Sequence, residues 1–362
     1  MPRLCLVGLT AIAFLVAGGG AGASPDADLS RWVATDLGNL GARVTVSDIN
    51  DRGQIVGESA NHGFVWENGS MRELGQGPFS GAERINERGQ IIGTSSSASN
   101  SQQHAVMWEN GKMIDLRGSR GVYTSVMAIN ERGEIIGSRS VPTGNGFTGT
   151  PVIWENGKMR NLWPGGVALA INNRGQVVGG TGAESSRAVV WQNGKITDLG
   201  PGVATDINER GQIGGERDGH VIVWRNGTSI DLGPGTAVAI NGRDQVTGFS
   251  RTPAGEWHGF LWQNGTMTDL GTLGGKWSIP TAISNRGQVV GYSTGKSGVQ
   301  HAFIWQNGTM TRLGSPNGNA RTRAVAINEH NQIIGDNCFT DCGIRAPRFA
   351  SKFAVLWTLQ RG

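Results

Sequence analysis

Residues 128–137 read AINERGEIIG, and residues 301–314 read HAFIWQNGTMTRLG. These stretches are the two halves of one repeat unit, which recurs eight times along the 362-residue chain with 33 to 44 residues between equivalent positions. That period is the size of one four-stranded blade of a β-propeller. The turn position of the first half is occupied by Asn50, Asn86, Asn130, Asn172, Asn208, Asn241, Ser284 and Asn328. The tryptophan of the second half falls at Trp66, Trp108, Trp154, Trp191, Trp224, Trp262, Trp305 and Trp357.

Two kinds of tight turn separate the apolar segments of each unit. Seven units carry Asn-Gly after the tryptophan, from Asn68-Gly69 to Asn307-Gly308, and this pair favours a type I′ hairpin between antiparallel strands. The other turn, N-x-R-G, ends in glycine six times and in Asp244 or Asn331 otherwise. Because aspartate and asparagine best replace glycine at positive φ, we expect a left-handed residue there, as in a hairpin with a G1 bulge.

The segments between the turns are apolar without alternation, as in Phe303-Ile304-Trp305. Such strands are covered on both faces. Since no part of the chain after residue 23 shows a convincing helical period, the predicted class is all-β. We expect an eight-bladed β-propeller of four-stranded antiparallel blades.

The position of the last strand predicts how the ring closes. A fourth-strand segment ending in leucine follows seven of the eight tryptophans, but only Thr358 to Gly362 follow Trp357. The missing copy stands at residues 32–38, WVATDLG, before the first asparagine turn. We therefore predict that an N-terminal strand completes the last blade and removes the exposed sheet edges.

The sequence resembles the bacterial extracellular repeat proteins named for a His-Ala-Phe signature. His301-Ala302-Phe303 carries the signature literally, and residues 62–64, 104–106 and 258–260 are close variants. The resemblance extends from about Trp32 to Trp357. It implies export and a repeat architecture, and no particular activity.

The N-terminus predicts secretion. An apolar run from Leu4 to Ala17 and small residues up to Ala23 are typical of a signal peptide over residues 1–23. Residues 24–362 would then form a single propeller domain, monomeric and extracellular or periplasmic, without a transmembrane segment. Removing Arg3 lowers the formal net charge of +4 to 4 − 1 = +3, which is too weak to indicate nucleic-acid binding.

Cysteine and histidine supply no metal or cofactor motif. Cys338 and Cys342 are the only cysteines after the signal peptide, and in an oxidising compartment they could form a disulfide or remain as free thiols. Five histidines stand four residues before a repeat tryptophan, namely His62, His104, His220, His258 and His301. We interpret them as structural, because equivalent positions on blades about 10 Å apart cannot share one ion.

Three residues are candidates for chemistry in the central channel. Two residues before the turn asparagine, five units carry alanine, whereas the first, second and fifth carry Asp48, Arg84 and Asp206. If these side chains point into the channel, they could serve acid–base catalysis in an extracellular lyase or hydrolase. A neutralising structural ion pair is the alternative that we favour.

The long loops carry aromatic residues that are not part of the repeat. Among them are Tyr123, Trp163, Trp257 and Trp277. Irregular aromatics above a regular scaffold are typical of a recognition surface, although they could also fill the top of the barrel. Our leading hypothesis is a non-catalytic binding propeller whose ligand, a glycan or a protein, contacts Trp257, Trp277, Tyr123 and Trp163. Arginine in seven N-x-R-G turns offers a basic rim on the opposite face as the competing surface.

Overall fold

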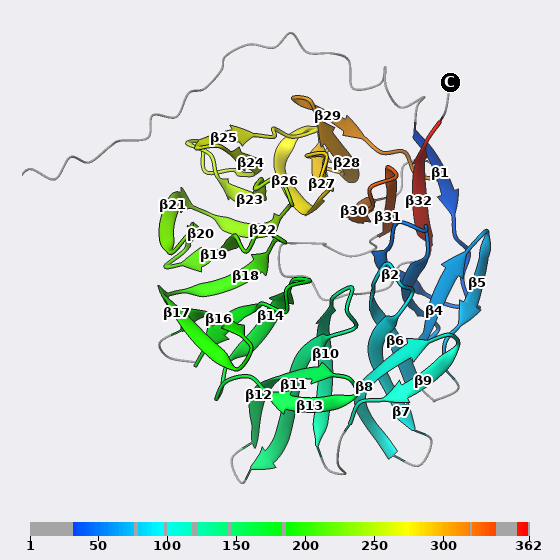
Figure 1. Cartoon of the computed structure of the whole chain (residues 1–362). Helices are drawn as coiled ribbons and strands as arrows, with labels where there is room; N and C mark the ends of the chain where they lie inside the picture. Colours follow the sequence, from blue (N-terminus) through cyan, green and yellow to red (C-terminus); the bar gives the residue numbers. More distant parts are fainter. Residues whose placement is uncertain are drawn as a thin grey trace, which may run out of the picture.

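The computed structural model describes residues 32–75, 79–97, 100–117, 122–143, 146–182, 186–316, 318, 321–337 and 353–360. The predicted signal peptide and both Cys338 and Cys342 lie outside these residues. The described residues form 32 β-strands and no helix. The strands make eight four-stranded antiparallel sheets, arranged as blades around a central axis (Figure 1).

Each blade consists of four strands that are numbered here from the axis outward. Blades 1 and 2 contain β2 (Val44–Ile49), β3 (Ile55–Ser59), β4 (His62–Glu67), β5 (Ser70–Glu73), and β6 (Phe79–Ile85), β7 (Ile91–Ser97), β8 (Asn100–Glu109), β9 (Lys112–Asp115). Blades 3 and 4 contain β10 (Tyr123–Ile129), β11 (Ile135–Thr143), β12 (Gly146–Glu155), β13 (Lys158–Asn161), and β14 (Val167–Ile171), β15 (Val177–Thr181), β16 (Arg187–Gln192), β17 (Lys195–Pro201). Blades 5 and 6 contain β18 (Val203–Ile207), β19 (Ile213–Arg217), β20 (His220–Arg225), β21 (Thr228–Pro234), and β22 (Thr236–Ile240), β23 (Val246–Arg251), β24 (Trp257–Gln263), β25 (Thr266–Asp269). Blades 7 and 8 contain β26 (Gly274–Ile283), β27 (Val289–Gly295), β28 (Gln300–Gln306), β29 (Thr309–Arg312), and β30 (Thr322–Ile327), β31 (Gln332–Asn337), β32 (Ala354–Leu359), β1 (Trp32–Asp36).

The predicted closure of the ring is confirmed. Strand β1 pairs antiparallel with β32, from Trp32 opposite Leu359 to Asp36 opposite Val355. The Leu37 N–H then donates to the Ala354 carbonyl at 2.9 Å. Blade 8 is therefore built from both ends of the described chain, and β1 lies beside β32 in Figure 1.

Both turn predictions are confirmed by the backbone angles. In the Asn-Gly turns, φ is between 49° and 51° at every asparagine and positive at the glycine that follows, as a type I′ turn requires. In the N-x-R-G turns, Asp244 and Asn331 replace glycine at φ 66° and 60°. The Gly53 N–H donates to Asn50 O and the Asn50 N–H to Gln54 O, which is the pattern of a type I turn with a G1 bulge.

The glycine that ends AINERGEIIG is required by a close approach between the first two strands. A Cβ atom on Gly57 would lie 2.0 Å from the Thr45 carbonyl oxygen, and the equivalent distance is 1.9 to 2.1 Å in all eight blades. A β-bulge brings that carbonyl close, because the register of β2 against β3 shifts between Val46 and Asp48. The same shift occurs in the first strand pair of every blade.

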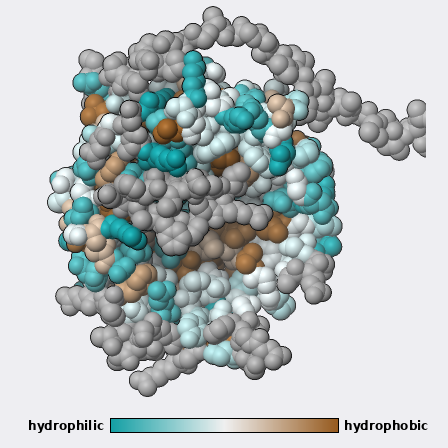
Figure 2. All heavy atoms as spheres, turned by 180° about the vertical axis from the view of Figure 1, so that it is seen from behind, coloured by the Kyte–Doolittle hydropathy of each residue, from teal (hydrophilic) through white to brown (hydrophobic). Residues whose placement is uncertain are grey.

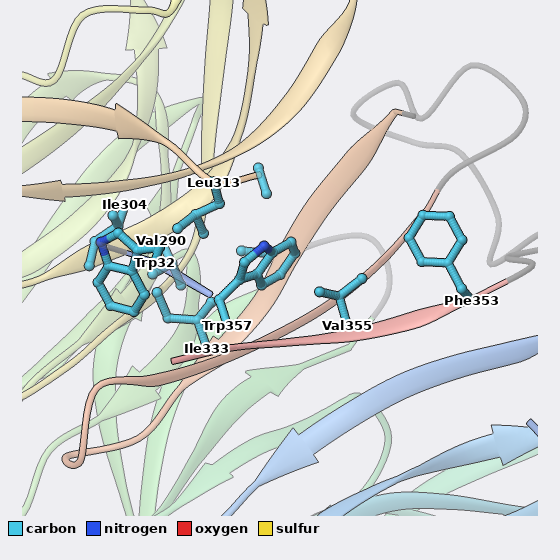
Figure 3. Close-up of a cluster of buried hydrophobic side chains, with 10 residues drawn as sticks. Trp32, Val290, Ile304, Leu313, Ile333, Phe353, Val355 and Trp357 are labelled. Atoms are coloured by element: carbon cyan, nitrogen blue, oxygen red, sulfur yellow. The ribbon is translucent and has the colours of Figure 1, made fainter. Parts of the chain in front are cut away.

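The hydrophobic core lies between the blades. Eight clusters of buried residues each join one blade to the next. In the cluster between blades 7 and 8, Trp32 from β1 packs with Val290 and Ile304 of blade 7 and with Trp357 of β32 (Figure 3). The Trp357 indole N–H also donates to Gly314 O at 2.6 Å. The repeat tryptophan thus bonds across a seam between blades.

The strand directions separate two faces. Both tight turns of every blade lie on one face, which we call the turn face. The connections from the second to the third strand, and from the fourth strand to the next blade, lie on the opposite face, which we call the loop face. Hydrophobic side chains gather near the middle of the molecule in the view of Figure 2. Among the described hydrophobic residues of the innermost strands, Tyr123, Met127 and Val167 are between 38% and 47% exposed.

Candidate functional site

The asparagines of the N-x-R-G turns link the blades into a ring. In blade 3, Asn130 Oδ1 accepts hydrogen bonds from the N–H groups of Arg132 and Glu134, which holds its own turn. Its Nδ2 donates to the carbonyl of Asn172 in blade 4 at 3.0 Å. Seven such links run in one direction around the axis, and the last joins Asn328 to Asn50. The repeat asparagine is thus a structural residue.

The missing eighth link falls at Ser284. The Ser284 hydroxyl bonds with Gln288 Oε1 at 3.1 Å within blade 7, and it is too short to reach blade 8. A different bond crosses this seam, from Gln288 Nε2 to Asn331 Oδ1 at 2.9 Å.

A second ring uses the residue after each asparagine. The Asp51 N–H, for example, donates to both carboxylate oxygens of Glu87 at 3.0 Å. Equivalent bonds occur at seven of the eight seams, and the gap falls where Gly242 has no side chain to offer. The acids of the turn face are therefore occupied by backbone N–H groups.

The turn arginines lie outside these rings and are all exposed. Arg132 pairs with Glu134, and Arg210 Nη1 lies 2.9 Å from Asp244 Oδ2. The turn face therefore combines a rigid hydrogen-bonded inner layer with a solvated cationic outer layer.

The channel aspartates bond to the backbone of neighbouring blades. Asp48 Oδ1 accepts from the Ile49 N–H at 2.9 Å, and Oδ2 accepts from the Ile85 N–H of blade 2 at 3.1 Å. Asp206 bonds in the same way to the N–H groups of Ile207 and, in blade 6, Ile240. Both carboxylates therefore fasten adjacent innermost strands together.

The electrostatics of the two carboxylates differ. Burial raises the pKa of Asp206 to about 6, although both backbone hydrogen bonds oppose the shift. Burial also raises the pKa of Asp48, but there the positive charge of Arg84 opposes it first. Arg84 and Asp48 are thus close enough to interact, whereas Asp206 lies four blades away on the far side of the axis. The structure does not bring the two aspartates together as a catalytic pair.

Four repeat histidines lie beside an acid on the outermost strand of their blade. The acid stands eleven residues after the histidine in each case. The pairs are His62 Nδ1 with Glu73 at 3.0 Å, His104 Nε2 with Asp115 at 3.5 Å, His220 Nδ1 with Asp231 at 3.0 Å and His258 Nδ1 with Asp269 at 2.9 Å. Asp269 raises the pKa of His258. Among the residues that the structure describes, no group of three or more metal-ligating side chains occurs.

Two of the predicted ligand-binding aromatics are partly exposed at the loop face of adjacent blades. In blade 6, Trp257 contacts Phe249 edge to face at 5.5 Å between ring centroids, and the Arg251 guanidinium lies 4.6 Å above the indole. In blade 7, Trp277 contacts Tyr292 in the same manner at 5.7 Å. Each indole is thus held by a second ring, which limits its rotamers before any ligand binds.

The other two predicted aromatics lie elsewhere. Tyr123 is 41% exposed at the start of β10 in blade 3, away from blades 6 and 7. Trp163 is only 2% exposed, and its indole N–H donates to Gly180 O in blade 4. Trp163 belongs to the core between blades 3 and 4, so its side chain is not available to a ligand on the loop face.

A groove that the sequence did not suggest opens between blades 4 and 5 on the loop face. Its volume is about 620 Å³, and Arg187, Val203, Glu216 and Arg217 contribute to its lining. Arg187 Nε lies 2.6 Å from Asp198 and Arg217 lies 3.9 Å from Asp231. The groove is thus partly polar, and its only sequence signal is the Pro201-Gly202 connection.

Comparison with known proteins identifies the architecture alone. No protein-family model matches the sequence, and a search of curated proteins finds no relative. No helix in the described ranges is long and apolar enough to cross a membrane.

Three solved structures show the fold. The β-propeller domain of the Trilobed protease from Pyrococcus furiosus matches with a TM-score of 0.51 and 14% identity, over 76% of this chain and 99% of that domain. The Pyrococcus horikoshii acylaminoacyl peptidase matches with a TM-score of 0.51 and 11% identity over 82% of this chain, which spans 58% of the peptidase. The WD40 domain of SCAP from fission yeast matches with a TM-score of 0.50 and 8% identity, over 91% of this chain and 98% of that domain. The chain is an eight-bladed β-propeller.

Proposed function

We propose that this protein is a secreted, non-catalytic binding propeller that takes a glycan or a protein on its loop face. The observation that carries the proposal is the pair of aromatic clusters on adjacent blades, Trp257 with Phe249 and Arg251, and Trp277 with Tyr292. None of these aromatic residues belongs to the repeat unit. Aromatic rings held rigidly at a partly exposed surface lose little entropy on binding and stack well on sugars or apolar side chains.

The rest of the molecule supports this choice of face by its own engagement. The acids and asparagines of the turn face bond to backbone groups of neighbouring blades. The carboxylates of Asp48 and Asp206 each accept two backbone N–H bonds in the channel. A hydrolytic role for these aspartates would require them to leave bonds that hold the innermost strands together.

The test is a panel of polysaccharides, cell-envelope polymers and secreted proteins offered to the purified protein, with binding and turnover measured in the same samples. Trp257→Ala and Trp277→Ala should each weaken binding about tenfold or more, because buried aromatic contacts dominate interface energies. Arg88→Ala, on the turn face, is the matched control and should bind like the wild type. Thermal unfolding of each variant separates lost contacts from lost folding.

Two outcomes would replace the proposal. If the tryptophan variants bind unchanged while Arg88→Ala loses binding, the ligand lies on the turn face. If a polymer is cleaved and Asp206→Ala abolishes cleavage, the protein is an enzyme of the channel.

A further inference from the structure

Blade 7 departs from the histidine–acid pattern of the other blades. In blade 6, Asp269 stands opposite Phe260 in the strand register and reaches back to His258, two residues away on the facing strand. In blade 7, Arg312 stands opposite Phe303 in the same register, with His301 in the position of His258. A diagonal pair of this kind lies within reach of long side chains. The carboxylate is thus replaced by a second basic side chain.

Blade 4 shows that a base on one strand still comes with an acid on the other. There, Arg187 occupies the histidine position, and its Nε lies 2.6 Å from Asp198 Oδ2. Blade 7 is therefore unlike its neighbours in holding two nitrogen-bearing side chains at one diagonal position without a carboxylate between them.

Both side chains in blade 7 are buried without a partner for their nitrogen atoms. His301 is 7% exposed, and no hydrogen bond joins its imidazole to another described residue. Arg312 Nε is a buried atom with no hydrogen-bond partner. An unpaired guanidinium N–H in the interior is unfavourable, because the lost bond to water is not replaced.

The surrounding charges do not compensate Arg312. Burial and the positive charge of Arg312 lower the pKa of His301 to about 4, so the imidazole is neutral at pH 7 and keeps one N–H donor. In the adjacent blade 8, the carboxylate of Asp336 is bound by Arg323 at 2.7 Å. The position is therefore a set of aimed donors that lacks an acceptor.

We propose that blade 7 binds an oxyanion between His301 and Arg312, where blades 1, 2, 5 and 6 carry their own carboxylate. The ligand class is a sulfate, phosphate or carboxylate group, free or attached to a larger molecule. The guanidinium supplies parallel N–H donors that match two oxygens of such a group, and the imidazole N–H supplies a third. The site does not depend on the aromatic clusters and stands if the ligand panel finds nothing on them.

The experiment titrates the full chain with sodium sulfate, sodium phosphate and sodium acetate at constant ionic strength, using chloride to balance. Binding is followed by calorimetry and by the ring resonance of His301. We expect saturable binding of at least one of these anions with a shift of that resonance. The anion that binds separates tetrahedral oxyanions from carboxylates.

Two variants assign the binding to this position. Arg312→Gln should weaken binding at least tenfold, whereas Arg160→Gln, on the outermost strand of blade 3, should leave it unchanged. Arg312→Asp recreates the histidine–acid pair of blade 6, so it should fold, abolish anion binding and raise the pKa of His301. Wild-type protein that binds none of the three anions, or an Arg312→Gln variant that binds as tightly as the wild type, would overturn the proposal.

Discussion

At the scale of single residues, Asp206 shows how a buried acid can belong to a scaffold. Its two oxygens accept the N–H groups of Ile207 and Ile240, which belong to adjacent blades. Burial raises its pKa from 3.8 to about 6. The folded chain therefore binds a proton at this site more tightly than the unfolded chain does.

This difference predicts a pH dependence of stability that Asp206→Ala should remove. Between about pH 4 and pH 6 the folded state holds more protons than the unfolded state, so the contribution of Asp206 to the free energy of unfolding falls as the pH rises. The fall amounts to at most about 3 kcal/mol across this window. Alanine fits, since five blades carry it at the same position.

The measurement is denaturant unfolding of the wild type and Asp206→Ala at pH 4, 5, 6 and 7. Relative to the variant, the wild type should lose stability as the pH increases through this range and should level off above about pH 6. A difference that is constant with pH would show that the folded pKa of Asp206 is not raised.

The sequence could identify Asp48, Arg84 and Asp206 only as exceptions. They stand out because alanine occupies the equivalent position in the other blades, and this placed them on the innermost strands, where they lie. Their hydrogen bonds could not be predicted, because the donors are backbone N–H groups of another blade. Trp163 was misplaced because a connection between blades can also contribute to the core that lies beneath it.

At the scale of the turns, the asparagine ring explains why one residue type recurs where aspartate or serine would also stabilise the local turn. Only asparagine offers an acceptor for its own turn and a donor for the next blade. Ser284 keeps the bonds within its blade but has no donor that reaches blade 8.

Ser284→Asn should therefore add the eighth link and stabilise the protein. A buried hydrogen bond to a backbone carbonyl contributes about 1 kcal/mol, so the unfolding temperature should rise. Ser229→Asn, at an exposed position of β21, is the control and should leave it unchanged. A Ser284→Asn variant that unfolds at or below the wild-type temperature would mean that the bond between Gln288 and Asn331 already satisfies this seam.

The elements themselves were the most predictable part of the structure. Asn-Gly, glycine at the end of N-x-R-G and unbroken apolar segments each have one local cause, and positive φ occurs at the expected residues. The β-bulge beside the channel left no such sign, since it inserts one residue without a marker of its own in the eight copies. The repeat glycine that accommodates it, Gly57 and its equivalents, was visible but its reason was not.

At the scale of the whole molecule, the ring is closed by one short strand. Trp32 is 7% exposed in the cluster between blades 7 and 8, and β1 supplies the outer edge of blade 8. Deleting residues 24–40 removes this strand and uncovers β32. Trp32→Ala alone should cost about 3 to 5 kcal/mol, as expected for a buried tryptophan.

Hydrogen exchange should locate the damage. In either variant, amides of β31 and β32 should exchange faster, far along the chain from the change, while those of blades 3 and 4 should keep their protection. Deleting residues 24–30, which precede β1, is the control and should change neither exchange nor unfolding temperature. Unchanged protection of β32 after the longer deletion would contradict the closure.

The asparagine ring also bears on how such a protein can change over generations. Each link joins a side chain of one blade to a backbone carbonyl of the next, and a backbone carbonyl is the same in every blade. A gene that loses or duplicates one whole repeat, between two turn asparagines, would bring together blades that have never met and still give each donor its acceptor. Recombination can therefore alter the number of blades without any new contact having to arise first, provided that the strand at the N-terminus still meets the last blade.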